Sequence, residues 1–211
     1  MEISAYAIAA VVGYLFGSVS AAVLLCRLFG KTDVRTKGSK NAGATNVARV
    51  YGARMGLLTF LFDIIKTCIA MTLGGLAGAL LTPASDASMW GMSIAAIGCI
   101  IGHCWPVFFG FKGGKGVSVS AAIALLIDWR LFLLLIAVFI VVVLITKRVS
   151  VGSLASAVLF VPVELLLGDT APYLLVIGSV LTVVVVLMHM GNIKRLINGT
   201  EPAFTLKKGE K

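Results

Sequence analysis

A glycine- and lysine-rich turn from Gly110 to Val117, with the sequence Gly-Phe-Lys-Gly-Gly-Lys-Gly-Val, is the part of this chain best suited to bind an anion. It separates two apolar segments, and its glycines let backbone N–H groups point into one small concavity that suits an oxyanion. A helix that starts after the turn would add the partial positive charge of its N-terminus, and Lys112 and Lys115 would add full charges. The spacing is not that of a Walker A motif, so we do not expect nucleotide hydrolysis. The turn predicts a phosphate-sized anion site at the edge of a membrane.

A second donor-rich segment runs from Asp33 to Arg49 and combines basic side chains with hydroxyls, amides and two glycines. Six of its side chains can donate hydrogen bonds to a phosphate: Ser39, Lys40, Asn41, Thr45, Asn46 and Arg49. A solvated basic loop that only fixes the membrane topology would also account for the charge. The density of Asn, Ser and Gly favours a binding loop.

A third cluster lies between His189 and Glu201, where the last apolar segment ends. His189 and Asn192 are three residues apart, so they share a face if this segment is helical. A neutral imidazole there could accept a proton from a hydroxyl or orient it. An interfacial histidine, with Lys194 and Arg195 as anchors for lipid headgroups, is the alternative interpretation.

A few polar side chains fall inside the apolar segments, where an unpaired charge is expensive. Asp63 and Lys66 are three residues apart, and we interpret them as a mutual ion pair that turns its helix toward the bundle. For His103 a packed, hydrogen-bonded side chain is favoured over a catalyst, and Glu164 is expected to reach the interface. The cysteines show no disulfide or metal spacing and are interpreted as unpaired apolar residues: Cys26, Cys68, Cys99 and Cys104.

The composition is that of an integral membrane protein. Of 211 residues, 59% are hydrophobic and only 13% charged, with a mean hydropathy of +1.05, whereas a soluble domain is about a quarter charged. The net charge of +9 would suggest nucleic acid in a soluble protein, but basic cytoplasmic loops explain it better here, so no nucleic-acid partner is expected. We expect a single all-α domain over residues 1–211, and we interpret the first apolar segment as a retained span.

The positions of the basic residues predict the topology. A spanning helix needs roughly 20 apolar residues, and the candidates are 3–25, 55–81, 91–109, 116–128, 131–146, 149–167 and 171–189. With seven spans, sixteen of the eighteen Lys and Arg residues fall on one side, which the positive-inside rule makes the cytoplasm. The N-terminus is then outside and the C-terminus inside. If 116–146 is a re-entrant hairpin, the number of spans is five.

Together the three clusters resemble the PlsY family of bacterial acyl-phosphate:glycerol-3-phosphate acyltransferases. Asp33-Val-Arg with the run 38–46 is similar to its first cytoplasmic motif, 103–117 to its second, and His189 with 192–196 and 199–201 to its third. The resemblance covers nearly the whole chain. One departure is Gly17-Ser-Val-Ser20, where the family often has Gly-Ser-x-Pro and a bend.

The resemblance implies a seven-span inner-membrane enzyme with its motifs in the cytoplasm. Its reaction joins glycerol 3-phosphate, through the 1-hydroxyl, to the acyl group of a fatty acyl-phosphate, and releases inorganic phosphate. It implies no metal, no cofactor and no acyl-CoA or acyl carrier protein donor; its partners are the two substrates and membrane lipid. Because phosphate leaves readily, such an enzyme mainly has to position two phosphates and neutralise their charge.

Residue roles follow from the same resemblance. It implies His189, Lys115 and Ser39 as catalytic residues, with Asn192 helping His189 to orient the attacking hydroxyl. It implies phosphate or substrate binding for Lys40, Asn41, Thr45, Asn46, Arg49, Lys112, Gly113, Gly114, Gly116 and Glu201. The main rival function is a transporter or channel for phosphate or organic phosphates, which would more often show internal repeats or interrupted helices at mid-membrane.

Overall fold

The structure is a computed structural model that describes residues 2–204, and every regular element in that range is helical. The α-helices of this range are α1 (Glu2–Ser18), α2 (Ala21–Leu28), α3 (Ala44–Tyr51), α4 (Ala53–Leu81), α5 (Ala87–Cys104), α6 (Val117–Ile127), α7 (Trp129–Thr146), α8 (Val149–Leu166), α9 (Pro172–Met188) and α10 (Met190–Ile197). Two short 3₁₀ turns, η1 (Val34–Thr36) and η2 (Val107–Phe109), lie in the connections. The tail residues Lys207, Lys208 and Lys211, which entered the charge count, lie outside the described residues.

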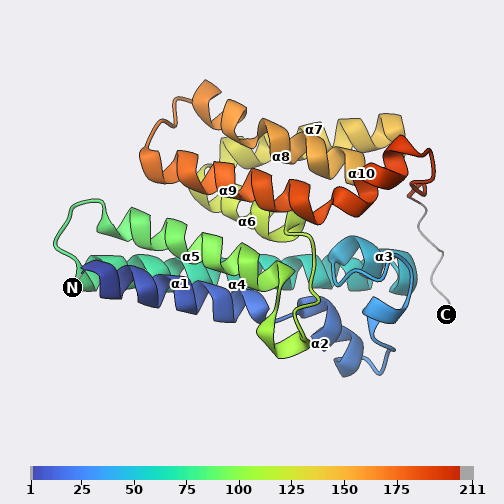
Figure 1. The fold of residues 1–211 in the computed structure, drawn as a ribbon, viewed down its shortest axis with the longest axis horizontal. Helices are drawn as coiled ribbons and strands as arrows, with labels where there is room; N and C mark the ends of the chain where they lie inside the picture. The colour runs from blue at the N-terminus through green and yellow to red at the C-terminus, as the bar shows by residue number, and fades with distance from the viewer. Residues whose placement is uncertain (1, 205–211) are drawn as a thin grey trace.

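The helices form two layers (Figure 1). Helices α1, α4 and α5 pack together in one layer, α7, α8 and α9 form the other, and α6 lies between them. The N-terminus and the loop from α4 to α5 lie at one end of the bundle, whereas α2, α3 and α10 lie at the other. The three polar clusters belong to this second end.

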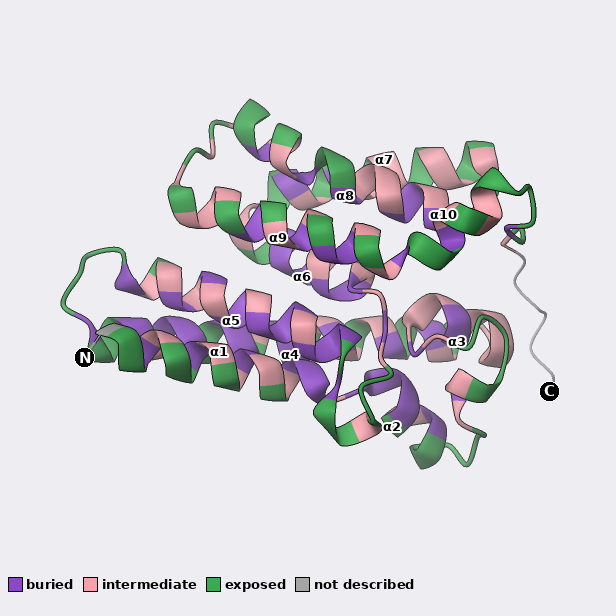
Figure 2. Ribbon diagram, viewed as in Figure 1, coloured by how far each residue is buried: buried purple, intermediate pink, exposed green. Residues whose placement is uncertain are grey.

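Small residues let α1 and α5 approach closely. A Cβ added at Gly13 would lie 2.8 Å from the carbonyl carbon of Ala95, and one added at Gly17 would lie 2.8 Å from that of Cys99. In a bilayer such close backbone packing contributes to helix association, because lipid gives little hydrophobic drive between helices. Buried residues gather along the contacts of α1, α4, α5 and α6, while α7 and α8 turn more exposed residues outward (Figure 2).

Several helices are long and apolar enough to cross a membrane. Within residues 2–204 these are Ile3–Leu28, Ala53–Leu81, Ala87–Phe109 and Trp129–Thr146. Helix α8 bends by 45° and the pair α9–α10 bends by 56°; if each of these counts as one span, the number of candidate spans rises to 6. Helix α6 has 11 residues, about 16 Å, which is near half of the hydrocarbon thickness. The expectation of an all-helical membrane protein is confirmed, and seven spans stay a prediction.

The first span breaks between α1 and α2, although Ser20 stands at the place where the resemblance led us to look for a proline. The side chain of Lys66 satisfies backbone groups at this break, since its Nζ donates to the carbonyl oxygens of Gly17 (3.1 Å) and Val19 (2.9 Å). Lys66 also lies 2.8 Å from Asp63 Oδ1. The predicted ion pair is confirmed, and it does more than orient a helix.

The prediction for Glu164 was wrong. It was expected to reach the interface, but its side chain is fully buried, and neither carboxyl oxygen has a hydrogen-bond partner within residues 2–204. Its helix turns it inward, where Gly178 leaves room for Oε2. The four cysteines are free in the structure.

Candidate active site

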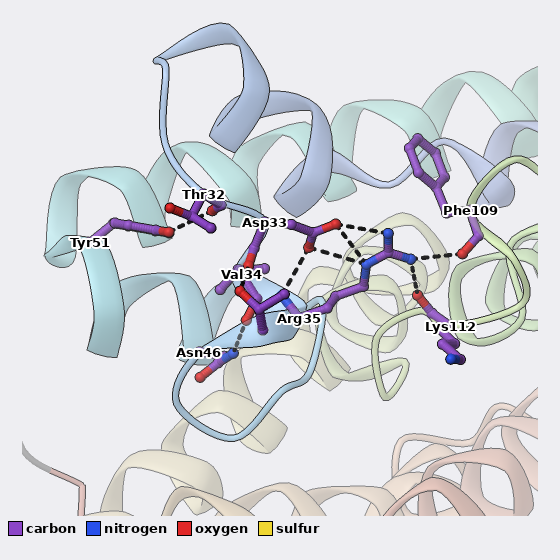
Figure 3. Close-up of polar contacts among 9 residues, drawn as sticks. Thr32, Asp33, Val34, Arg35, Asn46, Tyr51, Phe109 and Lys112 are labelled. Carbon is purple, nitrogen blue, oxygen red and sulfur yellow. Dashed lines mark hydrogen bonds and ion pairs between the residues drawn. The ribbon is translucent and has the colours of Figure 1, made fainter.

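The loop before α3 is fastened to the glycine-lysine turn by Arg35 (Figure 3). Its Nη2 pairs with Asp33 Oδ2 at 2.8 Å, and its Nη1 donates to the carbonyl oxygens of Phe109 (2.7 Å) and Lys112 (3.2 Å). The hydrogen bonds from Arg35 hold the pKa of Asp33 below its usual range. These contacts join residues 74 and 77 positions apart in the chain, so the first two clusters are one structural unit.

Asn46 shapes this loop from within. Its buried side chain accepts from the Ser39 N–H at 2.9 Å through Oδ1, and its Nδ2 lies within 3.2 Å of the carbonyl oxygens of Val34, Lys37 and Asn41. Because both ends of the amide are used by the backbone, Asn46 holds Ser39 and Asn41 in position at the pocket, whose wall it shares.

Two glycines of the turn, Gly113 and Gly114, do not contribute to the expected amide nest. The Gly113 N–H donates to Cys104 O (3.2 Å) and the Gly114 N–H to His103 O (3.0 Å), so both groups are used to fasten the turn to the end of α5. Gly114 also packs on the imidazole of His103, since a Cβ there would lie 2.7 Å from Cε1. What these glycines provide is close packing, and the turn delivers the side chain of Lys115 to the pocket.

The polar pocket has a volume of about 90 Å³. Three helices begin at its wall: α3 with Ala44 and Thr45, α6 with Val117 and Ser118, and α8 with Val149 and Ser150. The first N–H groups of a helix have no partner within the helix, and the helix dipole adds partial positive charge there. Three such ends beside Lys115 are suited to a phosphate group.

A chain of hydrogen bonds links the second and third clusters across the pocket. Lys115 Nζ donates to Asn192 Oδ1, Asn192 Nδ2 donates to Glu201 Oε1 at 2.7 Å, and Arg195 Nε donates to Glu201 Oε2 at 2.7 Å. Ser150 Oγ also donates to Glu201, at 2.7 Å. Burial lowers the pKa of Lys115 to about 8, and the nearby Arg195 adds to this effect. Burial alone would raise the pKa of Glu201, but its three donors outweigh it and lower that pKa.

His189 lies at the bend between α9 and α10 and is buried in the wall of the pocket. Its Nδ1 lies 2.8 Å from the carbonyl oxygen of Val185. Since a carbonyl can only accept, Nδ1 carries the proton. In the neutral ring Nε2 then has a lone pair that can accept a hydrogen bond from a substrate hydroxyl.

Most of the predicted residues meet at this pocket, and some do not. Its wall contains Ser39, Asn41, Thr45, Asn46, Arg49, Lys115, His189, Asn192 and Glu201. Five other predicted residues are not part of the wall: Lys40, Lys112, Gly113, Gly114 and Gly116. Ser150 and Ser153 were not predicted as site residues, and Arg195 was predicted only as an anchor for lipid headgroups. The available signal was the pair of hydroxyl side chains in the first turns of a span, shortly after Lys147-Arg148.

An apolar cavity of about 430 Å³ adjoins the polar pocket. The two share the wall residues Ala44, Thr45, Val117, Ser118, Val149 and Ser153. From there the cavity continues between α4, α6, α7 and α8 along side chains such as Phe60, Phe132 and Phe160. A molecule with an anionic head and an apolar tail fits this arrangement, with the head at the helix N-termini and the tail among the aromatic side chains.

Comparisons with known proteins agree over almost the whole chain. A family model described as glycerol-3-phosphate acyltransferase matches residues 7–199. The glycerol-3-phosphate acyltransferase of Clostridioides difficile strain 630 is 40% identical over 212 residues, which cover 99% of this chain and 100% of that protein. The enzyme of the same name from Finegoldia magna is 38% identical and covers 90% of this chain and 92% of its own.

Solved structures give the same result. This chain superposes on the crystal structure of PlsY, described as an integral membrane glycerol 3-phosphate acyltransferase in its glycerol 3-phosphate form, with a TM-score of 0.84 at 28% identity over 95% of this chain and 96% of that one. The lysophosphatidic acid form gives a TM-score of 0.82 at 27% identity with the same coverage. Since both the family model and relatives above 30% identity cover nearly all of it, this chain belongs to the glycerol-3-phosphate acyltransferase family of integral membrane enzymes.

Proposed function

We propose that this protein transfers a fatty acyl group from an acyl-phosphate to the 1-hydroxyl of sn-glycerol 3-phosphate, giving lysophosphatidic acid and inorganic phosphate. The observation that carries the proposal is the cationic polar pocket with an apolar cavity directly beside it. Its relatives are named for the acceptor, and the two PlsY structures are described as forms with acceptor and with lysophosphatidic acid. Both substrates carry a phosphate, and only the donor carries a long apolar tail.

The phosphates bind among Lys115, Arg49 and the three helix N-termini, while the acyl chain enters the apolar cavity. Ser39, Asn41 and Thr45 hold the glycerol backbone, and Asn192 keeps Lys115 aimed into the pocket. Glu201 braces Asn192 and Arg195. The hydrogen bonds that join these side chains support this assignment, because such a chain fixes the direction of each donor before substrate arrives.

His189 orients the attacking hydroxyl through Nε2. The hydroxyl oxygen attacks the acyl carbonyl carbon, the bond from that carbon to the bridging phosphate oxygen breaks, and the phosphate leaves with the electron pair. The hydroxyl proton goes to the departing phosphate, since a buried imidazolium beside Lys115 and Arg195 would be costly. No covalent intermediate on the protein is required, and catalysis comes from positioning and charge stabilisation.

We further propose a bacterial inner-membrane location, a single domain, seven spans with α6 as the short one, an N-terminus outside and an active site facing the cytoplasm. The bias of Lys and Arg toward one set of connections supports this orientation. The grouping of α2, α3 and α10 at one end of the bundle, away from the N-terminus, supports it as well (Figure 1). Impermeant thiol reagents in intact cells test it: Ser85→Cys should react and Lys31→Cys should not, and the reverse pattern would contradict the orientation.

The assay uses purified protein in lipid or detergent with palmitoyl-phosphate and glycerol 3-phosphate, and follows both lysophosphatidic acid and phosphate release. Lys115→Ala should lower kcat/KM by about 10²–10³-fold without changing the thermal unfolding midpoint. Lys31→Ala removes an exposed lysine away from the pocket and should leave kcat/KM unchanged. Phosphate uptake into vesicles without acyl transfer would contradict the proposal and favour a transporter.

A further inference from the structure

A buried polar cluster that reaches the wall of the polar pocket through His103 has no part in the mechanism above. Asp63, Lys66 and His103 come from α4 and α5, and their exposed fractions are 1%, 3% and 5%. Ionisable groups at this depth in a membrane protein are expensive, so they point to a functional role. Their contacts indicate which one.

Lys66 connects three segments of the chain. Its ammonium lies within hydrogen-bond distance of the carbonyl oxygens of Gly17 and Val19 at the break in the first span, and of His103 Nδ1 at 3.1 Å. Asp63 Oδ1, at 2.8 Å, balances its charge. The pair therefore ties α4 to the break and to the end of α5.

The same contact fixes the form of His103. A lysine ammonium can only donate, so Nδ1 of His103 carries a lone pair, and the ring proton lies on Nε2. Asp63 Oδ1 is farther from Nδ1, at 3.5 Å. Nε2 is the ring atom nearest to the position that a Cβ on Gly114 would occupy, and His103 forms part of the wall of the polar pocket.

His103 in turn supports the turn that carries Lys115. Its carbonyl oxygen accepts from the Gly114 N–H at 3.0 Å, and its ring fills the space that a Cβ at Gly114 would need. The turn is thus held on His103 by its backbone and by its side chain, one residue before Lys115.

We propose that Asp63 and Lys66 are positioning residues for acyl transfer: they lock the ring of His103 in the wall of the pocket, and through His103 they fix the turn that places Lys115. This inference rests on the proposed function. A change to the pair lowers kcat/KM even where the protein stays folded, because a shift of about 1 Å in a catalytic group costs roughly 10²-fold. A pair with a purely structural role would affect stability alone.

A double variant separates the two roles. Lys66→Met leaves Asp63 buried without a counter-charge and should destabilise the protein, whereas Asp63→Leu/Lys66→Met removes both charges, a change that is often neutral for stability. We expect the double variant to recover much of the thermal unfolding midpoint lost in Lys66→Met while kcat/KM stays at least tenfold below that of wild type. Wild-type kcat/KM in the double variant would overturn the proposal.

Variants of His103 test the same link without changing the ion pair. His103→Gln can place an amide N–H near the position of Nε2, whereas His103→Phe keeps a ring but no nitrogen, so we expect His103→Gln to retain about tenfold more kcat/KM. Equal, wild-type activity in both variants would refute the positioning role. Glu164→Gln, a buried carboxyl away from the pocket, is the matched control and should match wild type. An inactive wild-type protein in the same assay would instead refute the proposed function.

Discussion

Gly114→Ala measures how tightly the turn before Lys115 is held. The new Cβ would lie 2.7 Å from His103 Cε1 and closer still to Nε2, whereas ordinary contact begins at 3.4 Å. The imidazole cannot retreat, because Lys66 holds its Nδ1 at 3.1 Å. The turn must therefore move by about 1 Å, and we expect kcat/KM to fall roughly 10²-fold. Overpacking should also lower the free energy of unfolding by about 1–3 kcal/mol.

The matched control is Gly191→Ala. Its Cβ would meet only Arg195 Nη1, at 3.7 Å, and Gly191 lies in the first turn of α10, so alanine fits there. Neither glycine has a positive φ, and neither change adds backbone strain. Lysophosphatidic acid formation is measured against glycerol 3-phosphate concentration at saturating acyl-phosphate, with thermal unfolding of the same samples. Wild-type kcat/KM in folded Gly114→Ala would show that the turn is not rigidly seated and would refute the reasoning.

Three further predictions follow from the site. Burial lowers the pKa of Lys115 to about 8, so its charge is lost as pH rises through that value. KM for glycerol 3-phosphate should therefore rise about tenfold per pH unit above that pKa. Lys115→Arg should show no such rise, and a flat wild-type profile would contradict the assignment. Because the pKa of Glu201 is lowered, its ionised carboxylate stabilises the protein at pH values above the ordinary pKa of 4.5, and this contribution is lost as pH falls through the lowered pKa. The thermal unfolding midpoints of wild type and Glu201→Gln should therefore differ at neutral pH and converge in acid. Ala124→Phe fills part of the apolar cavity and should lower kcat/KM for palmitoyl-phosphate more than for lauroyl-phosphate; equal losses would place the acyl chain elsewhere.

The apolar helices could be predicted because length and hydrophobicity are local properties. The segment expected at 55–81 is α4 (Ala53–Leu81), and the one expected at 131–146 is α7 (Trp129–Thr146). Helices α3 and α10 were not predicted as such, since short amphipathic helices in polar connections depend on what they pack against. The break in the first span contains no proline and depends on Lys66, which lies 49 residues from Gly17 in the sequence. No local pattern at Ser20 indicates that contact.

For the site, residue types were easier to predict than the direction of each group. Ser39, Lys115, His189 and Asn192 reach one pocket, as the three clusters suggested. The prediction of an amide nest was wrong for Gly113 and Gly114, because their N–H groups donate to carbonyl oxygens at the end of α5. Glycine content indicates that N–H groups can converge, but their partners are set by the tertiary structure.

The position of Lys115 thus depends on packing deep in the bundle. The turn is fastened to the end of α5, and α5 is held against α1 by the close approach of Gly17 to Cys99. Lys66 joins the same two helices by bonding the carbonyl of Gly17 and the ring of His103. A phosphate site built on a flexible loop would lose the preorganisation that acyl transfer needs. Here the loop is short, and its donors are held in place by three packed helices. Changes in the packing of these helices, far from substrate, should therefore appear first in kcat/KM.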